Sequence, residues 1–254
     1  MTNSVGLTAE SLLANSITAN LKREARMISE SQWFECVEAS SDGASIKIPQ
    51  TGKYTFSNAA NAALFGLSTP RQVIGLTVDE LHFSKTQHGD AWAKKIKQMD
   101  YLAQEKRCSV KDTHAYINQN GVLVYKTTTK LPLVGLRGTV LGIVTLSHDL
   151  THHLSHRLLY FTYKEMCGKK VAIAKTLRHL DIDDDFFMPP TEMELLTLLE
   201  HAAGKSNKAV ANSLGISVRT IETHMAHLRI KLNDRGLSDV ISRLRNPAHI
   251  IDAL

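Results

Sequence analysis

Cysteine is scarce in this sequence. The three cysteines, Cys36, Cys108 and Cys167, stand far apart in a chain of 254 residues. An odd number of widely spaced cysteines argues against a disulfide framework, and no CxxC or Cys/His spacing indicates a zinc finger. The simplest interpretation is a protein of a reducing compartment.

Long hydrophobic runs are also missing. No apolar stretch approaches the roughly 20 residues that span a bilayer, and residues 1–20 lack the basic start and apolar core of a signal peptide. The sequence contains no Gly-rich phosphate loop and no recognisable catalytic triad, Cys/His pair or carboxylate pair. We therefore expect a soluble, cytoplasmic protein that does not contact a membrane and is not an enzyme.

The overall composition is that of a globular protein. Apolar residues make up 43% of the chain and charged residues 22%, which allows packed cores. A length of 254 residues predicts one large or two small domains. The net charge of +5 is compatible with a polyanionic partner but does not identify one.

The pattern of the chain changes at about residue 41. Apolar residues at helical spacing predict a helix over residues 8–39. Alternating runs and turn signals follow, including Asn120-Gly121, the strongest short hairpin signal. The predicted elements are two strands within residues 45–56, a short helix over 58–65, a polar helix over 91–104, and strands over 108–117, 122–133 and 139–147.

This order of two strands, short helices and three antiparallel strands resembles the PAS family of sensor domains. The resemblance covers residues 33–151. It implies an α+β fold whose last strand leads into a helix that passes a signal on. The motifs that carry it are Asn58-Ala-Ala, Phe65-Gly66-Leu-Ser68, Asn120-Gly121, Lys130-Leu-Pro-Leu133 and Gly142-Ile-Val-Thr-Leu-Ser-His-Asp149-Leu-Thr151.

The ligand of this PAS-like part stays open. In haem-binding PAS domains an axial histidine lies close to the position of His88, so haem is one hypothesis for this residue. A small apolar or aromatic ligand, or no ligand, are the alternatives. A cysteine-adduct flavin photosensor is disfavoured, because no cysteine lies on the helix after Asn58.

Residues 152–188 are expected to form a helical linker. An acidic run over residues 181–185 and the pair Pro189-Pro190 mark its end, since proline cannot continue a helix. A narrow apolar seam is predicted along it, made by Leu154, Leu158, Tyr160 and Phe161.

Histidines cluster at the start of this linker. On a helix His152 and His156 would lie one turn apart and could both bind one metal ion. A solvated linker face is the plainer interpretation, and both readings stay open. The residues are His148, His152, His153 and His156.

The last 65 or so residues predict three helices joined by tight turns, with a glycine after each of the first two. Thr191 and Glu194 form a capping-box pattern before the first helix. The second is predicted over residues 207–214, and Ser217 caps a third over residues 218–232. Two helices joined by a tight turn are typical of a helix-turn-helix.

The third helix predicts a buried stripe and a polar outer face. Ile221, Met225 and Leu228 recur at helical spacing and share the buried side. A partly basic outer face suits the major groove of duplex DNA. Eight basic residues against three acidic ones between Gly204 and Arg245 agree with a phosphate partner. The outer face is predicted to carry Arg219, Thr223, Ala226, His227 and Ile230.

These residues also resemble the DNA-binding domain of the LuxR family over residues 190–245. The resemblance implies an all-α four-helix domain whose third helix enters the major groove and whose fourth contributes to a dimer. Met193 and Ala209 depart from the family pattern, and Ala226 cannot donate a hydrogen bond, which leaves the base preference in doubt. The matching motifs are Gly204-Lys-Ser-Asn-Lys208, Val210-Ala211, Leu214-Gly-Ile-Ser217, Thr220-Ile-Glu-Thr-His224 and Lys231-Leu232.

The resemblance assigns roles to single residues. Those at Ser206, Lys208, Thr220 and Lys231 approach phosphates, and those at Glu222, Thr223 and Ala226 face bases. The predicted DNA-binding residues are Ser206, Asn207, Lys208, Ser217, Arg219, Thr220, Glu222, Thr223, Ala226, His227 and Lys231. For the fourth helix, closure of the domain core and dimerisation are equally favoured for Leu237, Val240, Ile241 and Leu244.

The sequence thus predicts a PAS-like sensor part followed by a LuxR-type DNA-binding part. The expected function is a sequence-specific regulator of transcription that binds double-stranded DNA as a homodimer, with RNA polymerase as a further partner left open. The alternative is a signalling adaptor that uses the PAS part for protein contacts and does not read DNA sequence. The expected division is residues 1–40, 41–151, 152–188 and 189–254.

Overall fold

The computed structural model describes residues 35, 37–81, 89–135, 137–233 and 235–245. The helix expected over residues 8–39 lies almost wholly outside them and stays a prediction. Residues 42–254 form one compact unit. No described helix is both long and apolar enough to cross a membrane.

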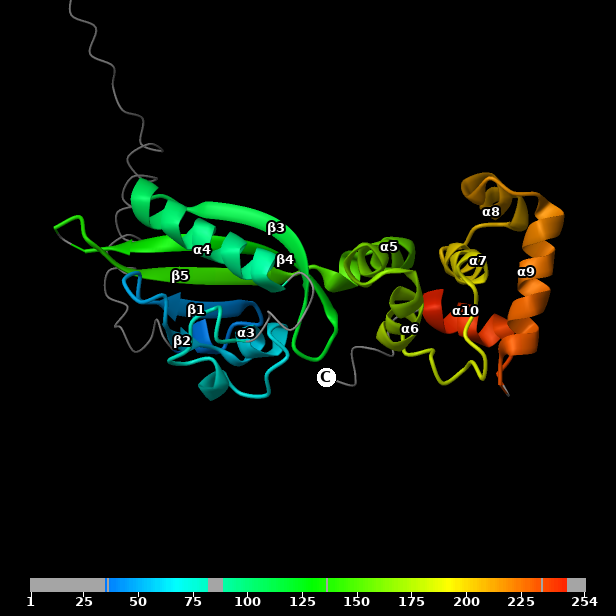
Figure 1. Ribbon diagram of the computed structural model, residues 1–254, viewed down its shortest axis with the longest axis horizontal. Helices are drawn as coiled ribbons and strands as arrows, with labels where there is room; N and C mark the ends of the chain where they lie inside the picture. The colour runs from blue at the N-terminus through cyan, green and yellow to red at the C-terminus, as the bar shows by residue number, and fades with distance from the viewer. Residues whose placement is uncertain (1–34, 36, 82–88, 136, 234, 246–254) are drawn as a thin grey trace, which may run out of the picture. The chain divides into compact units, whose positions relative to one another are not determined.

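A five-stranded antiparallel sheet forms the centre of the first folded part (Figure 1). Its strands lie in the order β2-β1-β5-β4-β3, so that the first strand pairs with the last. The predicted order of elements is confirmed, and with it the α+β class expected of the PAS-like part. The strands are β1 Gly43–Lys47, β2 Tyr54–Ser57, β3 Val110–Ile117, β4 Leu123–Val134 and β5 Val140–Asp149.

The hairpin between β3 and β4 forms at the predicted Asn-Gly pair. Gly121 has a φ of 75°, in the left-handed region that glycine adopts without steric cost. The side-chain oxygen of Asn118 accepts hydrogen bonds from the backbone N–H groups of Asn120 and Val122, each at 3.0 Å. These bonds satisfy donors that the turn removes from the strand ladder.

Helices cover one face of this sheet. The longest of them, α4, contacts β3, β4 and β5 and extends slightly beyond the predicted range at both ends. Its Trp92, Ile96 and Met99 pack into an apolar core with Tyr54 and Phe65. The helical segments of this part are α3 Ala59–Leu64, η1 Pro70–Gln72 and α4 Gly89–Lys106.

The helices expected as a linker pack into the core of the C-terminal helices. They share one apolar cluster with α7, α9 and α10. Tyr160 is fully buried there, whereas Leu158 is 51% exposed, so the predicted single seam is wrong. The Tyr160 hydroxyl turns inward to donate to Glu192 Oε1 at 2.8 Å. The segments are η3 Thr151–His153, α5 His156–Cys167 and α6 Lys169–His179.

The predicted signals at the ends of the C-terminal helices are confirmed. Thr191 and Glu194 form the capping box, and the Ser217 hydroxyl accepts from the backbone N–H of Thr220 at 3.0 Å. Gly215 ends the second helix with a φ of 69°. These helices are α7 Glu192–Ala202, α8 Asn207–Leu214, α9 Val218–Lys231 and α10 Leu237–Arg245.

The left-handed conformation of Gly215 generates a stability prediction. No atom lies within 4 Å of a Cβ built at this residue, so Gly215→Ala strains only the backbone. We expect a loss of about 1 kcal/mol in the free energy of unfolding, measured by denaturant titration. Gly236→Ala is the matched control, because Gly236 lacks a positive φ and its Cβ would meet nothing closer than 3.4 Å. Equal losses in both variants would contradict this explanation.

Candidate functional site

The outer face of α9 is open to solvent, as its helical phase predicts. Ile221 and Leu228 are fully buried on the opposite side. The Thr223 hydroxyl donates to the backbone carbonyl of Arg219 at 3.0 Å, so its proton is engaged while its oxygen can still accept hydrogen bonds. The exposed residues of this face are Arg219, Glu222, Thr223, Ala226, His227 and Ile230.

Several predicted phosphate contacts also shape the ends of helices. Ser206 caps α8 by accepting from the N–H of Ala209, and Ser217 caps α9. The Thr220 hydroxyl lies 2.8 Å from the Ser217 hydroxyl. The side-chain oxygen of Asn207 lies 2.8 Å from His201 Nε2. These side chains therefore hold helix N-termini, whose partial positive charge favours phosphate.

The carboxylate of Glu194 joins α7 to α9. Its Oε2 accepts from the Thr191 backbone N–H and from Lys231 Nζ, each at 2.7 Å. Its Oε1 lies 3.2 Å from His227 Nδ1. Burial alone would raise the pKa of this carboxyl, but the hydrogen bonds from Lys231 and Thr191 outweigh it and lower the pKa. Lys231 and His227, both predicted to contact DNA, thus each have Glu194 as a partner within the protein.

Two further carboxylates of α7 hold its other neighbours. Glu200, almost fully buried, forms ion pairs with Lys205 at 2.5 Å and with Arg157 of α5. Glu192 accepts from Lys164 at 2.5 Å and lies 2.9 Å from Lys169. The hydrogen bonds from these two lysines lower the pKa of Glu192 to about 2. The carboxylates of α7 therefore fix α5, α6 and α9 around it.

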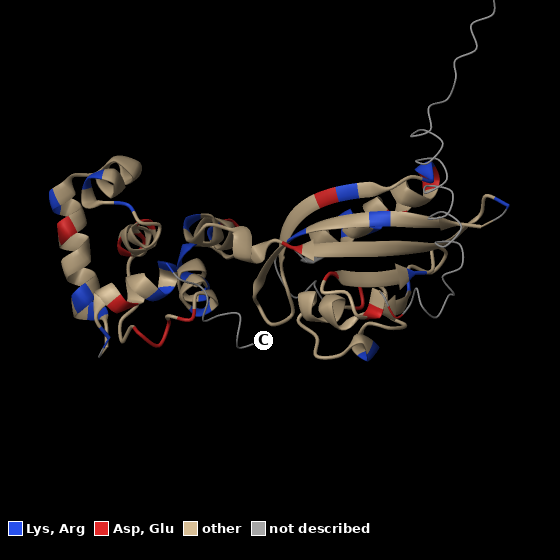
Figure 2. Cartoon of the chain, turned by 180° about the vertical axis from the view of Figure 1, so that it is seen from behind, with Lys and Arg blue, Asp and Glu red and all other residues tan. Residues whose placement is uncertain are grey.

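Figure 2 marks the basic residues in blue. Those of the C-terminal part fall into two groups according to whether their side chains have partners within the protein. Lys208, Arg219 and Arg229 make no side-chain ion pair or hydrogen bond with another described residue, so their charges are available to a phosphate backbone. Arg229 was missing from the predicted site, although its exposure on α9 follows from helical phase. The engaged residues are Lys205 with Glu200, Lys231 with Glu194, Arg235 and Arg243 with Asp185, and Arg245 with the carbonyl of His201.

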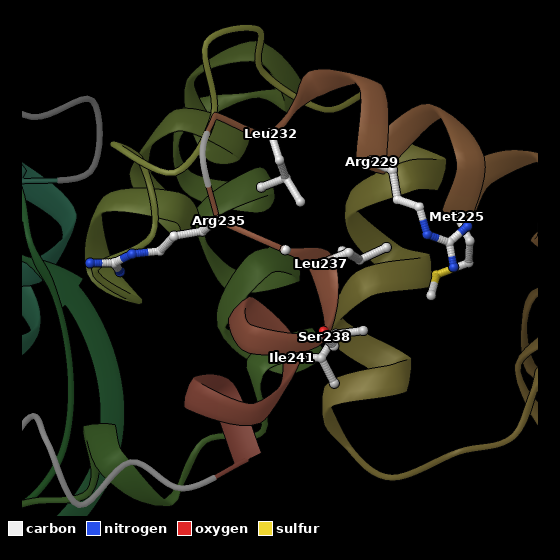
Figure 3. Close-up of a pocket in the computed structure, with 8 residues that line it drawn as sticks. Met225, Arg229, Leu232, Arg235, Leu237, Ser238 and Ile241 are labelled. Carbon is white, nitrogen blue, oxygen red and sulfur yellow. The ribbon is translucent and has the colours of Figure 1, made fainter.

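The four residues predicted for dimerisation differ in how deeply the structure buries them. Leu237, Val240 and Leu244 are buried in the apolar cluster shared with α7. Leu237 and the half-buried Ile241 line a shallow hollow of about 520 Å³ between α9 and α10, opposite Arg229 (Figure 3). The structure thus gives these residues a role in the domain core, and a role in dimerisation stays a prediction.

The inner face of the five-stranded sheet buries three lysines that no sequence motif indicated. Lys47 and Lys130 both bind Asp100 of α4, at 2.7 and 2.8 Å. Lys126 lies on the same face of β4 as Lys130, four residues away. The sequence pattern that could have indicated them is the alternation of Lys126, Thr128 and Lys130 within a strand. Polar residues in such an alternation usually lie on a solvent-exposed face, so the pattern predicts exposed lysines. Burial of this face follows only from the helices packed on it.

Lys126 has no ionic partner among the described residues. Its Nζ lies 5.2 Å from the ring centre of Tyr116 and 5.3 Å from that of Phe65, at distances of cation–π contacts. Burial, and secondarily the charge of Lys130, lowers the pKa of Lys126 to about 7. Aromatic faces, and no carboxylate at ion-pair distance within the described residues, therefore surround this amine.

His114 pairs with Lys126 across β3 and β4. Its Nδ1 lies 3.0 Å from Asp112 Oδ2, and its buried Nε2 has no hydrogen-bond partner. Burial, together with the charge of Lys126, lowers the pKa of His114 to about 4, so the ring is neutral. Because the Asp112 carboxylate accepts from Nδ1, Nε2 is left as an acceptor. The interior thus presents a donor and an acceptor on neighbouring strands.

The remaining histidine hypotheses have different outcomes. His88 lies outside the described residues, so its proposed haem role stays a prediction. His148 Nδ1 binds Asp42 at 2.7 Å, and the rings of His152 and His153 lie 4.1 Å apart. These residues do not form a group of three converging ligands in the described part of the chain.

Residues 189–244 match the family model of bacterial regulatory proteins, luxR family. This match confirms the LuxR-type helix-turn-helix expected in this part of the chain. No curated protein matches the sequence significantly.

Several solved structures are similar to the chain at low identity. A ligand–DNA complex of VqmA from Vibrio cholera is 20% identical, with 86% of this chain and 88% of that chain covered and a TM-score of 0.46. A phage VqmA–DPO complex is 22% identical, with coverage of 89% and 88% and a TM-score of 0.41. The PAS domain of a LuxR-family regulator from Burkholderia thailandensis, in complex with ethanol, is 17% identical, with coverage of 47% and 97% and a TM-score of 0.36.

The lowered pKa of Lys126 predicts a pH dependence of stability. The pKa is about 7 in the folded protein and 10.5 ordinarily, so the unfolded chain binds more protons between these values. This group therefore raises the free energy of unfolding by up to about 1.4 kcal/mol per pH unit as the pH increases from 7. We expect Lys126→Met to be more stable than wild type at pH 7, with a difference that shrinks toward pH 10.5.

Urea titrations of the full chain at several pH values measure this difference. Lys111→Met is the matched control, because Lys111 lies exposed on the adjacent strand β3. A stability difference for Lys126→Met that does not vary with pH would show that the amine keeps its ordinary pKa.

Proposed function

Because residues 189–244 form a luxR-family domain, we propose that this chain is a sequence-specific DNA-binding regulator of transcription with a PAS input. The exposed face of α9, flanked by basic side chains without internal partners, is the observation that carries the proposal. The family is one of regulatory proteins, and we extend this to a chain without enzymatic activity that acts in the cytoplasm.

The geometry supports one mode of docking. α9 enters the major groove with Glu222, Thr223 and Ala226 toward the bases, as in other helix-turn-helix proteins. Lys208 and Arg219 lie at the N-terminal ends of α8 and α9 and reach phosphates on either side. Base contacts by such residues give sequence preference, whereas phosphate contacts give affinity and position.

A second copy of the chain completes the proposed complex. A single helix-turn-helix makes few base contacts, and two-fold dimers double them on palindromic sites. The open side of α10, where Ile241 borders the hollow, is one surface for this contact. We retain the four-part division at residues 1–40, 41–151, 152–188 and 189–254 as part of the proposal.

The PAS input reaches the DNA-binding helices through α5 and α6. The Tyr163 hydroxyl accepts from the backbone N–H of Leu123 at the start of β4, at 2.7 Å, and lies 3.0 Å from His179 Nδ1 of α6. Lys175 donates to the carbonyl of Gly121 at 2.6 Å. A small polar ligand bound at Lys126 would change the position of β4. This change would shift the population of helix arrangements around α7.

Sequence reading is tested by enrichment of sheared genomic duplex on the full-length protein, near physiological salt with excess competitor DNA. We expect wild type to enrich a shared, palindromic motif. Thr223→Arg should enrich a changed motif, because it alters a base-facing side chain. Lys208→Ala should keep the motif but bind every sequence more weakly, with a salt dependence of log affinity that is shallower by about one. Absence of any motif with wild type would favour the adaptor alternative.

The route of the PAS input is tested with Tyr163→Phe, which removes the hydroxyl bound to Leu123. We expect the affinity of the full-length protein for its enriched duplex to change by about two- to thirtyfold, the range that corresponds to coupling energies of about 0.5–2 kcal/mol. Tyr101→Phe, at an exposed tyrosine of α4, is the control and should change nothing. Unaltered affinity in Tyr163→Phe would contradict this route while leaving DNA binding intact.

A further inference from the structure

Three potential metal ligands converge between α7 and α9. A carboxylate oxygen of Glu194 and one ring nitrogen each of His224 and His227 lie within 4.8 Å of one another. Glu194 lies in α7 and both histidines lie in α9, with α8 between these helices in the chain, so helical phase alone gives no indication of this group. It is the one group of three such ligands found among the described residues.

The hydrogen bonds around the group leave some of its ligand atoms available to an ion. Oε2 of Glu194 is occupied by Thr191 and Lys231, whereas Oε1 has the ring of His227 at 3.2 Å as its partner. His224 Nδ1 is buried and has no hydrogen-bond partner. A buried polar atom without a partner carries a desolvation cost that a bound ion would relieve.

We propose that Glu194, His224 and His227 form a zinc-binding site. Two imidazole nitrogens and one carboxylate oxygen are a known ligand set of zinc sites that keep a fourth position for water. The separation of 3.2 Å between Glu194 Oε1 and His227 Nδ1 fits two ligands that each lie about 2.0–2.2 Å from one tetrahedral ion. The half-exposed ring of His227 gives the ion access from solvent.

The charges of the group are compatible with a divalent cation. A histidine binds zinc through a neutral imidazole nitrogen, and the negative charge of Glu194 offsets part of the charge of the ion. Lys231 stays on the other carboxylate oxygen. The ion would then bridge the N-terminal turn of α7 to the middle of α9 and stabilise the orientation of the recognition helix. This site does not depend on the proposed function in DNA binding.

The test uses the full-length protein after treatment with a chelator and dialysis into metal-free buffer. Calorimetric titration with zinc chloride measures stoichiometry and affinity, and magnesium chloride serves as the comparison ion because it prefers oxygen ligands. His227→Asn removes one exposed ligand and leaves the capping role of Glu194 intact. The double variant His152→Asn/His153→Asn is the matched control, because it removes two exposed histidines outside the group.

We expect wild type and the double variant to bind one zinc ion per chain with equal affinity, and His227→Asn to bind at least about tenfold more weakly. Equal affinity in His227→Asn, loss of binding in the double variant, or no saturable binding by wild type would overturn the proposal. A second measurement on wild type alone avoids any folding defect of the variant. Zinc should protect His227, but not His152, from acylation by diethyl pyrocarbonate, and modification of both despite zinc would also overturn the proposal.

Discussion

The arrangement of the C-terminal helices depends on carboxylates that α7 holds at or below the protein surface. Glu194 binds Lys231 and His227 of α9, and Glu200 binds Arg157 of α5. A carboxylate removed from water is stable only while its partners are in place. The angle at which α9 presents its outer face is therefore set by ion pairs as well as by its apolar stripe, and loss of one partner would disturb a whole helix.

The PAS part buries charge of the opposite sign. Asp100 compensates Lys47 and Lys130, but Lys126 faces aromatic rings and a neutral histidine. Burying an amine in this way opposes folding, and natural proteins commonly accept such local conflicts at functional sites. As a result, a donor, the Lys126 amine, and an acceptor, His114 Nε2, lie on adjacent strands. Stability alone does not account for this arrangement, and it agrees with the proposed role of this part as an input.

The helices between these two parts do more than connect them. α5 and α6 contribute to the same apolar cluster as α7, α9 and α10, and that cluster includes Ile117 and Leu123 of the PAS hairpin. Tyr163 and Lys175 add polar contacts to the same hairpin. A displacement of β4 consequently changes contacts that support α7, which is the element that orients α9. Shared packing, and not a flexible tether, joins the proposed input to the proposed output.

The sequence by itself determined the features that local chemistry controls. The Asn120-Gly121 turn, the capping box of Thr191 and the outer face of α9 follow from backbone preferences and helical period, and they were predicted in place. Tertiary structure alone decided which side of β4 is buried, and therefore that Lys126 is enclosed. It also decided that Glu194 meets His224, because contacts between distant segments depend on how whole elements pack, and no local pattern encodes that packing.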